Sequence, residues 1–132
     1  MREQRNGPRH AVGVDIIEIG RIKQAVERWG KRFLGRTYTD GELAYCRGRA
    51  PQLAARFAAK EAMMKALGTG RYGIGWQDIE VVRQRGHAPT IQLHGRALGV
   101  AERQAVGHVA LSISHSREYA VASVVIEVGA PR

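Results

Sequence analysis

The chain has little cysteine, few aromatic residues and no long apolar run. Its only cysteine, Cys46, cannot form an internal disulfide, and a single thiol is typical of a reducing compartment. No run of about 18 apolar residues is present, so we expect no membrane-spanning helix. Residues 1–10 are polar and basic without an apolar stretch, which is unlike a secretory signal. These absences predict a cytoplasmic protein.

Basic residues outnumber acidic ones, and the 132 residues carry a formal net charge of +9. A surface of this sign attracts polyanions such as nucleic acid, phosphorylated small molecules, anionic membranes or acidic proteins. Only two Phe and two Trp are present, and they are not interleaved with basic residues in the way that stacks bases. A small basic nucleic-acid-binding protein stays open as an alternative that explains the charge alone.

The length favours one domain, and 44% apolar residues are enough for a core. Apolar periodicity predicts strands over 11–17, 79–83, 90–93, 109–114 and 119–127, and helices over 20–29, 39–47, 51–67 and 95–105. Helices mixed with antiparallel hairpins predict an α+β domain, which we place at 11–128. Residues 1–10 are predicted to be a flexible basic tail, and residues 129–132 a second tail.

Charged side chains occupy unusual positions on the predicted helix 51–67. One face of this helix forms an apolar stripe made of Leu53, Phe57, Met64 and Leu67. Lys60 falls within the stripe, Arg56 lies at its border, and Glu61 and Lys65 project together from the adjoining side. A lysine among apolar residues needs an anionic partner. The alternative is a Lys60 that extends to solvent beside an ordinary surface pair of Glu61 and Lys65.

The same helix has a small flank and a glycine-rich end. Ala54, Ala58 and Ala62 would let another backbone approach closely. Gly68 and Gly70 are suited to end the helix. Residues 68–73 match G-x-G-x-x-G, but a dinucleotide-binding loop needs a strand before the glycines and a helix after them. We therefore interpret this segment as a helix stop and a loop whose backbone can approach a ligand, or as a turn without function.

Asp15 interrupts an apolar strand whose other face carries Val12, Val14 and Ile16. It could act like a cap for the following helix. Alternatively, it could pair with a distant carboxylate such as Glu61 to hold a hard cation. Mg²⁺ typically takes one or two carboxylates together with phosphate oxygens and waters.

The histidines give a weaker signal. His108 and His115 bracket a predicted strand, and the five histidines and single cysteine show no zinc-type spacing. The adjacent Ser114 and His115 do not form a catalytic pair, because neighbours on a strand point to opposite faces.

Three segments of the chain form a recognisable series of motifs. Residues 13–21 are similar to G-x-D-x-x-E-x-x-R, residues 56–70 to R-F-A-x-K-E-A-x-x-K-A-x-G-x-G, and residues 111–116 to S-x-S-H. Residues 86–89 are similar to a G-x-P turn with one extra residue. Across roughly 11–127 the chain therefore resembles the holo-acyl-carrier-protein synthase family, the small bacterial phosphopantetheinyl transferases.

The resemblance implies an Mg²⁺-dependent transfer of 4′-phosphopantetheine from coenzyme A to a serine of an acidic acyl carrier protein. The reaction releases adenosine 3′,5′-bisphosphate and activates the carrier for fatty acid biosynthesis. The resemblance assigns Asp15 and Glu61 to the metal, and Glu61 and Lys65 to catalysis. It assigns to the coenzyme A site Arg56, Lys60, Lys65, Gly68, Gly70, His115 and Ser116. Arg21 and Arg28 are the implied contacts to the carrier protein.

The resemblance also implies a homotrimer with active sites between subunits, one subunit contributing Asp15 and its neighbour the helix of Glu61, or the converse. Lys65, one helical turn from Glu61, could neutralise the leaving phosphate and donate a proton to it. The general base is open between Glu61 acting through a water and that water itself. A different Mg²⁺-dependent enzyme, such as a nuclease or phosphohydrolase, is the second alternative.

Overall fold

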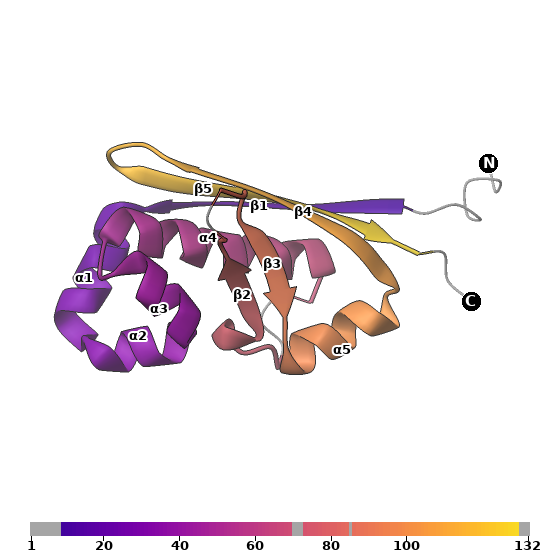
Figure 1. The fold of residues 1–132 in the computed structure, drawn as a ribbon, viewed down its shortest axis with the longest axis horizontal. Coiled ribbons are helices and arrows are strands. Elements are labelled where there is room, and N and C mark those ends of the chain that lie inside the picture. The colour runs from indigo at the N-terminus through magenta and orange to yellow at the C-terminus, as the bar shows by residue number, and fades with distance from the viewer. Residues whose placement is uncertain (1–8, 70–72, 85, 130–132) are drawn as a thin grey trace.

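The computed structural model describes residues 9–69, 73–84 and 86–129. Its elements, shown in Figure 1, are β1 (Arg9–Glu18), α1 (Ile19–Trp29), α2 (Lys31–Thr37), α3 (Asp40–Cys46), α4 (Ala50–Leu67), the 3-10 helix η2 (Trp76–Asp78), β2 (Ile79–Val82), β3 (Thr90–Leu93), α5 (Gly95–Arg103), β4 (Val106–His115) and β5 (Tyr119–Val128). The predicted α+β class is confirmed. In the described ranges, no helix is both long and apolar enough to cross a membrane.

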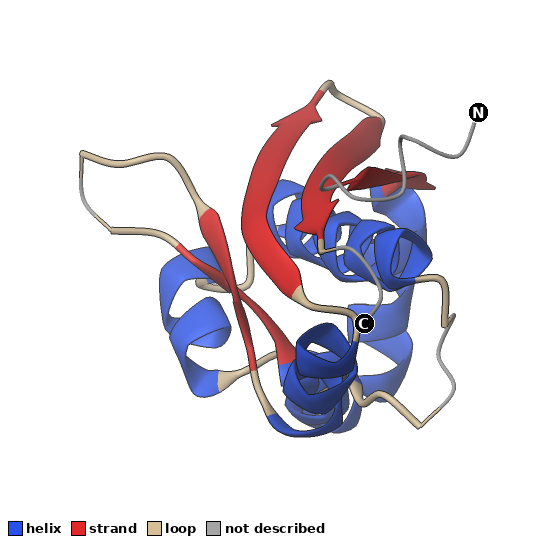
Figure 2. Ribbon diagram, turned by 90° about the vertical axis from the view of Figure 1, so that its right-hand side faces the viewer, coloured by secondary structure: helices blue, strands red, loops and turns tan. Residues whose placement is uncertain are grey.

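Two antiparallel sheets and one long helix organise the domain. The larger sheet has the strand order β1-β5-β4, and β2 pairs with β3 beside it (Figure 2). Helix α4 runs along one face of the larger sheet (Figure 1). The side chains of β5 that face α4 are fully buried, namely Ala120, Ala122, Val124 and Ile126. The core therefore lies between α4 and this sheet.

The opposite face of the larger sheet is apolar and uncovered in the single chain. Val12, Val14 and Ile16 share that face, as predicted, and are 51–63% exposed. Asp15 lies on the other face of β1, the one that packs against α4.

Gly13 brings β1 into backbone contact with α4. A Cβ atom at this position would lie 1.8 Å from the Ala62 carbonyl oxygen and 2.8 Å from the Ala66 amide nitrogen. Only glycine fits such an approach. The small alanine flank predicted for the helix is thus the surface on which the strand rests.

The ends of the predicted helices agree with their local signals. Thr39 caps α3, and its hydroxyl and the Glu42 carboxylate complete the predicted capping box. Gly68, at φ 77°, ends α4 in the left-handed conformation. Helix α2 and the turn η2 were not predicted, because seven and three residues are too short to show apolar periodicity.

The strands extend further than predicted at both ends of the domain. Arg9 pairs with Val128, so Arg9 and His10 belong to β1 and the predicted N-terminal tail is two residues too long. The first eight residues and residues 130–132 lie outside the described ranges. Gly129 donates its amide to the Ala105 carbonyl.

Candidate functional site

Asp15 and Lys65 meet where β1 crosses α4. Asp15 Oδ1 lies 3.0 Å from Lys65 Nζ, which also donates to the Val14 carbonyl at 3.0 Å. The Lys65 side chain is 52% exposed and that of Asp15 is 16% exposed, so the pair is open to solvent on the lysine side. Glu61 precedes Lys65 by four residues, about one turn of the helix. The predicted acids and the catalytic lysine therefore belong to one region of one chain.

This arrangement corrects two expectations. Asp15 does not cap the following helix: Glu18 occupies the N-cap of α1, where no side chain donates or accepts a capping hydrogen bond. The strand of Asp15 and the helix of Glu61 pack together within a single chain, and do not come from different subunits.

A hard divalent cation fits the residues present at this site. Asp15 and Glu61 supply carboxylate oxygens, the donor type that Mg²⁺ prefers. The described part of the chain contains no group of three or more His, Cys, Asp or Glu side chains that could enclose a metal by themselves. Two protein carboxylates with the remaining positions taken by substrate phosphate and water is the usual arrangement for Mg²⁺.

Arg56 is a buried cation with unused donors. Its side chain is 3% exposed and its guanidinium lies 4.4 Å from the centre of the Tyr45 ring. Among the described residues, Nε and Nη2 have no hydrogen-bond partner. Unpaired buried donors are costly and rare in native proteins. Both atoms are closed off from solvent, so a ligand could reach them only if the surrounding residues moved, and the predicted ligand role of Arg56 stays a prediction.

Lys60 does not face an open site. Its side chain is completely buried, and Nζ lies 2.8 Å from Glu42 Oε1 and 2.9 Å from the Trp76 carbonyl oxygen. The sequence argument that Lys60 needs an anionic partner was right, but that partner is Glu42. The expected contact between Lys60 and coenzyme A does not fit this burial.

His115 and Ser116 lie at the turn between β4 and β5, at the end of the sheet opposite to the two termini (Figure 1). The Ser116 hydroxyl accepts from the amides of Glu118 and Tyr119, and His115 Nδ1 lies 3.2 Å from the Ser116 carbonyl. The hydrogen bonds of these two side chains thus remain within the turn. Gly68 lies at the end of α4, whereas Gly70 falls outside the described residues.

Arg21 and Arg28 are exposed on α1, as predicted for contacts with a partner. Arg28 lies 5.2 Å from the centre of the Trp29 ring. Trp29, the last residue of α1, lines a pocket of about 790 Å³ together with Arg32, Phe33, Arg36, Thr37, Phe57, Gly75 and Trp76. The sequence analysis missed this pocket, because α2 supplies half of its lining and was not predicted. The density of Arg and aromatic residues over 28–36 was the available signal.

Known proteins share this fold and these motifs. The family model of the 4′-phosphopantetheinyl transferase superfamily matches residues 11–124. The holo-[acyl-carrier-protein] synthase of Koribacter versatilis (strain Ellin345) is 51% identical over 119 residues, which cover 87% of this chain and 95% of that protein.

Solved structures agree with the sequence match. The Helicobacter pylori holo-[acyl-carrier-protein] synthase in complex with coenzyme A has a TM-score of 0.79 at 32% identity, covering 87% of this chain and 98% of that chain. The Bacillus anthracis holo-(acyl-carrier-protein) synthase in complex with CoA (3′,5′-ADP) has a TM-score of 0.72 at 35% identity, covering 90% of this chain and 96% of that chain.

The chain therefore belongs to the 4′-phosphopantetheinyl transferase superfamily, in the branch formed by the holo-[acyl-carrier-protein] synthases. It is an enzyme, and its class is phosphopantetheinyl transferase. The family predicted from the sequence motifs is confirmed.

Proposed function

We propose that this chain transfers 4′-phosphopantetheine from coenzyme A to a serine of an acidic apo acyl carrier protein, with Mg²⁺ held by Asp15 and Glu61. The observation that carries the proposal is the ion pair between Asp15 and Lys65, one helical turn from Glu61, in a chain of this family. The two solved relatives described above are complexes with coenzyme A or its nucleotide part.

The reaction is the attack of a serine hydroxyl on the β-phosphorus of coenzyme A, with adenosine 3′,5′-bisphosphate leaving. When bound, Mg²⁺ would supply positive charge against the diphosphate. Lys65 extends from α4 with its ammonium half exposed, so it can neutralise the leaving phosphate and donate a proton to it. Asp15 holds that ammonium in place before the substrate binds. Glu61, or a water beside it, accepts the serine proton.

Coenzyme A recognition would use residues of more than one subunit. The Arg56 guanidinium lies over the Tyr45 ring with two unpaired donors, and it would bind an anionic group of coenzyme A once those buried donors became accessible. His115 and Ser116, at the tip of a projecting hairpin, would complete the coenzyme A site of a neighbouring subunit.

The uncovered face of the larger sheet supports a trimer. Val12, Val14 and Ile16 are exposed there, and β5 adds Val121 and Val125 in register with them. The same face of β4 carries the small side chains of Ala110, Ser112 and Ser114, which would let a neighbour approach closely. Ser123 lies opposite Val14, so this face combines apolar and small polar side chains, and an exposed group of branched apolar residues on such a face marks an interaction site. We assign it to the contact between subunits of a homotrimer.

The acidic carrier protein would dock at α1 and α2. Arg32 and Arg36 line the aromatic pocket described above, and the exposed Arg21 and Arg28 add positive charge on α1. Opposite charge accelerates encounter and fixes orientation, while a buried apolar contact supplies affinity. In this proposal, the acidic carrier protein is the partner that the net positive charge of the chain attracts. The cytoplasmic location expected from the single cysteine stays a prediction.

A mass measurement tests this function. Apo carrier protein incubated with the enzyme, coenzyme A and Mg²⁺ should gain the mass of one phosphopantetheine group, and a carrier whose acceptor serine is replaced by alanine should not. Glu61→Gln should abolish the transfer and leave the trimer folded in sedimentation. Near-normal turnover by Glu61→Gln would contradict the metal assignment. Absence of the mass gain with wild-type enzyme would contradict the function.

The nucleic-acid-binding alternative has less support. It accounts for the charge, but it gives no role to Asp15 beside Lys65 or to the unpaired donors of Arg56. Salt-sensitive binding to nucleic acid, without binding to coenzyme A, would favour it.

A further inference from the structure

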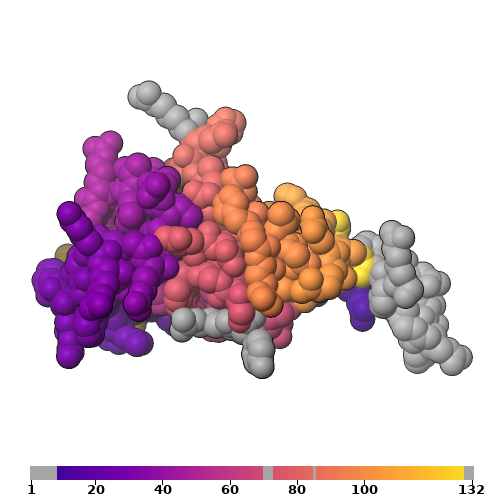
Figure 3. All heavy atoms as spheres, turned by 90° about the horizontal axis from the view of Figure 1, so that it is seen from below, coloured from indigo at the N-terminus to yellow at the C-terminus, as the bar shows by residue number. Residues whose placement is uncertain are grey.

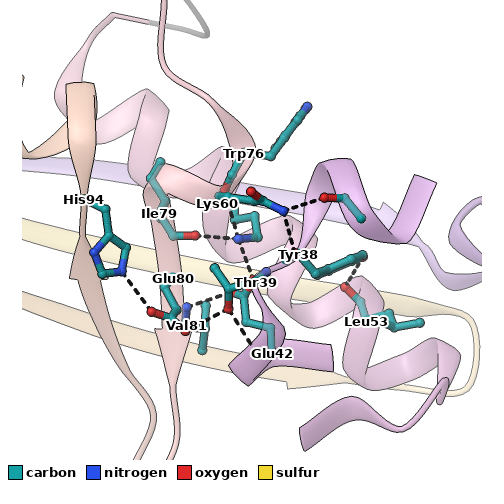
Figure 4. A network of polar contacts seen from close by, with 12 residues as sticks. Tyr38, Thr39, Glu42, Leu53, Lys60, Trp76, Ile79, Glu80, Val81 and His94 are labelled. Carbon is teal, nitrogen blue, oxygen red and sulfur yellow. Dashed lines mark hydrogen bonds and ion pairs between the residues drawn. The ribbon is translucent and has the colours of Figure 1, made fainter. Parts of the chain in front are cut away.

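Lys60 and Glu42 form a buried ion pair where α3, α4 and β2 meet (Figure 4). Besides Glu42 Oε1 at 2.8 Å, Lys60 Nζ contacts the carbonyl oxygens of Trp76 at 2.9 Å and of Ile79. These three acceptors match the three N–H bonds of an ammonium, whereas a neutral amine has only two. The geometry matches a charged lysine whose three donors are all occupied, so no donor remains for a ligand.

Glu42 is used just as fully. Its Oε1 also accepts from the Thr39 amide at 2.9 Å, and its Oε2 accepts from the Val81 amide at 2.7 Å. The pair thus joins the start of α3, the middle of α4 and strand β2. Burial lowers the pKa of the Lys60 ammonium, and the Glu42 carboxylate opposes that shift.

The network fixes one short segment, residues 76–81. Lys60 donates to the carbonyl of Trp76, the first residue of η2, and to that of Ile79, the residue that follows η2. From the opposite side, the Gln77 side-chain amide donates to the carbonyls of Tyr38, at 2.9 Å, and Gly35, and so connects η2 to α2. The backbone of this turn is therefore anchored on two sides by polar contacts.

The anchored segment forms one wall of the aromatic pocket. The Trp76 indole projects away from the Lys60 ammonium (Figure 4) and stacks on Phe57 with ring centres 4.7 Å apart. Both rings line the pocket together with Trp29 and Phe33. Lys60 follows Phe57 by three residues, so both lie on neighbouring positions of α4. Lys60 also binds the backbone of Trp76 in η2, so it connects the two elements that carry the stacked rings.

We propose that Lys60 and Glu42 are positioning residues for the carrier-protein pocket: by holding the backbone at Trp76 and Ile79, they set the Trp76–Phe57 wall against which the carrier docks. The identity of the docking partner rests on the proposed function. Lys60 therefore acts on the acceptor substrate through Trp76 and makes no contact with coenzyme A.

Kinetics of a double variant test the assignment. Lys60→Met combined with Glu42→Met removes both charges, so neither is left unpaired in the interior. We expect the KM for carrier protein to rise about tenfold while the KM for coenzyme A stays within about twofold. Tyr38→Phe is the matched control: it removes a buried hydrogen bond to the Leu53 carbonyl but keeps the ring beside Lys60 and the backbone carbonyl that accepts from Gln77. It should leave the KM for carrier protein unchanged. An unchanged KM for carrier protein in the double variant, or an equal rise for coenzyme A, overturns the proposal.

Fluorescence gives a readout that does not depend on transfer. Trp29 and Trp76 are the only two tryptophans of the chain, and a Trp29→Phe background isolates Trp76. In that background the double variant should shift Trp76 emission to the red and raise its quenching by acrylamide. Unchanged emission and quenching refute the positioning role, even if the wild-type enzyme fails to modify a carrier. Failure of wild-type transfer refutes only the proposed function.

A milder variant covers the case in which the double variant does not fold. Gln77 is exposed, and Gln77→Ala removes the second anchor of η2 without touching a charge. We expect a rise of about threefold in the KM for carrier protein at constant KM for coenzyme A. If the KM for carrier protein did not rise in Gln77→Ala, the proposal would be overturned.

Discussion

Helix α4 carries two lysine–carboxylate pairs of nearly equal length in opposite surroundings. Lys60 and Glu42 are 2.8 Å apart and completely buried, whereas Lys65 and Asp15 are 3.0 Å apart with side chains 52% and 16% exposed. The buried ammonium has all its donors occupied by protein. The open ammonium is accessible to solvent, and in the proposed function it binds a phosphate of the substrate. Five residues along one helix thus separate a pair that supports the structure from a pair that a substrate can reach.

The largest contrast is expected when each lysine is replaced by methionine. Lys65→Met should lower kcat by about 10²- to 10⁴-fold, because in the proposed mechanism it removes the group that neutralises and protonates the leaving phosphate. Its melting temperature should move little, since a solvent-exposed ion pair contributes at most about 1 kcal/mol. Initial rates and calorimetry on the same sample measure both effects.

Lys60→Met should show the reverse pattern. Leaving Glu42 charged and unpaired in the interior should lower the free energy of unfolding by about 3–5 kcal/mol. Denaturant titration measures this loss. If Lys65→Met were the less stable of the two variants, or if Lys60→Met kept wild-type stability, the distinction between the two pairs would be wrong.

A second contrast separates the two ends of the molecule. Arg21→Glu or Arg28→Glu on α1 should raise the KM for carrier protein about tenfold, because a charge that attracts the acidic partner is reversed. The KM for coenzyme A should stay nearly constant. Arg103→Glu is the matched control, since it lies on α5 at the other end of the surface (Figure 3). Equal changes for both substrates, or an equal effect of Arg103→Glu, would contradict docking at α1.

The smallest effect is expected at Glu80. Its side chain is 18% exposed, which is between the buried Lys60 and the half-exposed Lys65. Burial raises the pKa of its carboxyl, but hydrogen bonds from Thr39 and His94 outweigh burial and hold the pKa below 4.5. Because the folded pKa is the lower one, ionised Glu80 stabilises the protein above pH 4.5, and this contribution is lost as the pH falls through the folded pKa. Glu80→Gln should remove less than about 1 kcal/mol of acid sensitivity. An unaltered profile of melting temperature below pH 4.5 would count against this role.

Local signals in the sequence were sufficient to locate most elements. The Thr39–Glu42 capping box, the alternation around Asp15 and the stop at Gly68 depend on residues close together in the chain, and all three are confirmed. Helix α2 has no comparable repeat over its seven residues. The pocket that it lines therefore could not be predicted.

Lys60 shows what local signals omit. The sequence predicted an anionic partner for Lys60, and the family resemblance suggested that this partner was bound coenzyme A. Glu42 already had a complete local explanation as part of a capping box, yet its carboxylate also serves Lys60 and the Val81 amide. The capping box fully explained Glu42 from the sequence, and its second role as the partner of Lys60 is visible only in the folded structure.

The contact at Gly13 has a consequence for how the acidic site keeps its dimensions. At Gly13 no side chain separates the strand from the helix, so their distance at this point depends on main-chain atoms and not on rotamers. Asp15 follows two residues later on the same face. The main-chain contact at Gly13 therefore fixes how close the backbone that carries Asp15 lies to the helix that carries Lys65. The position of the strand that carries Asp15 is thus set by a rigid contact between two segments of backbone.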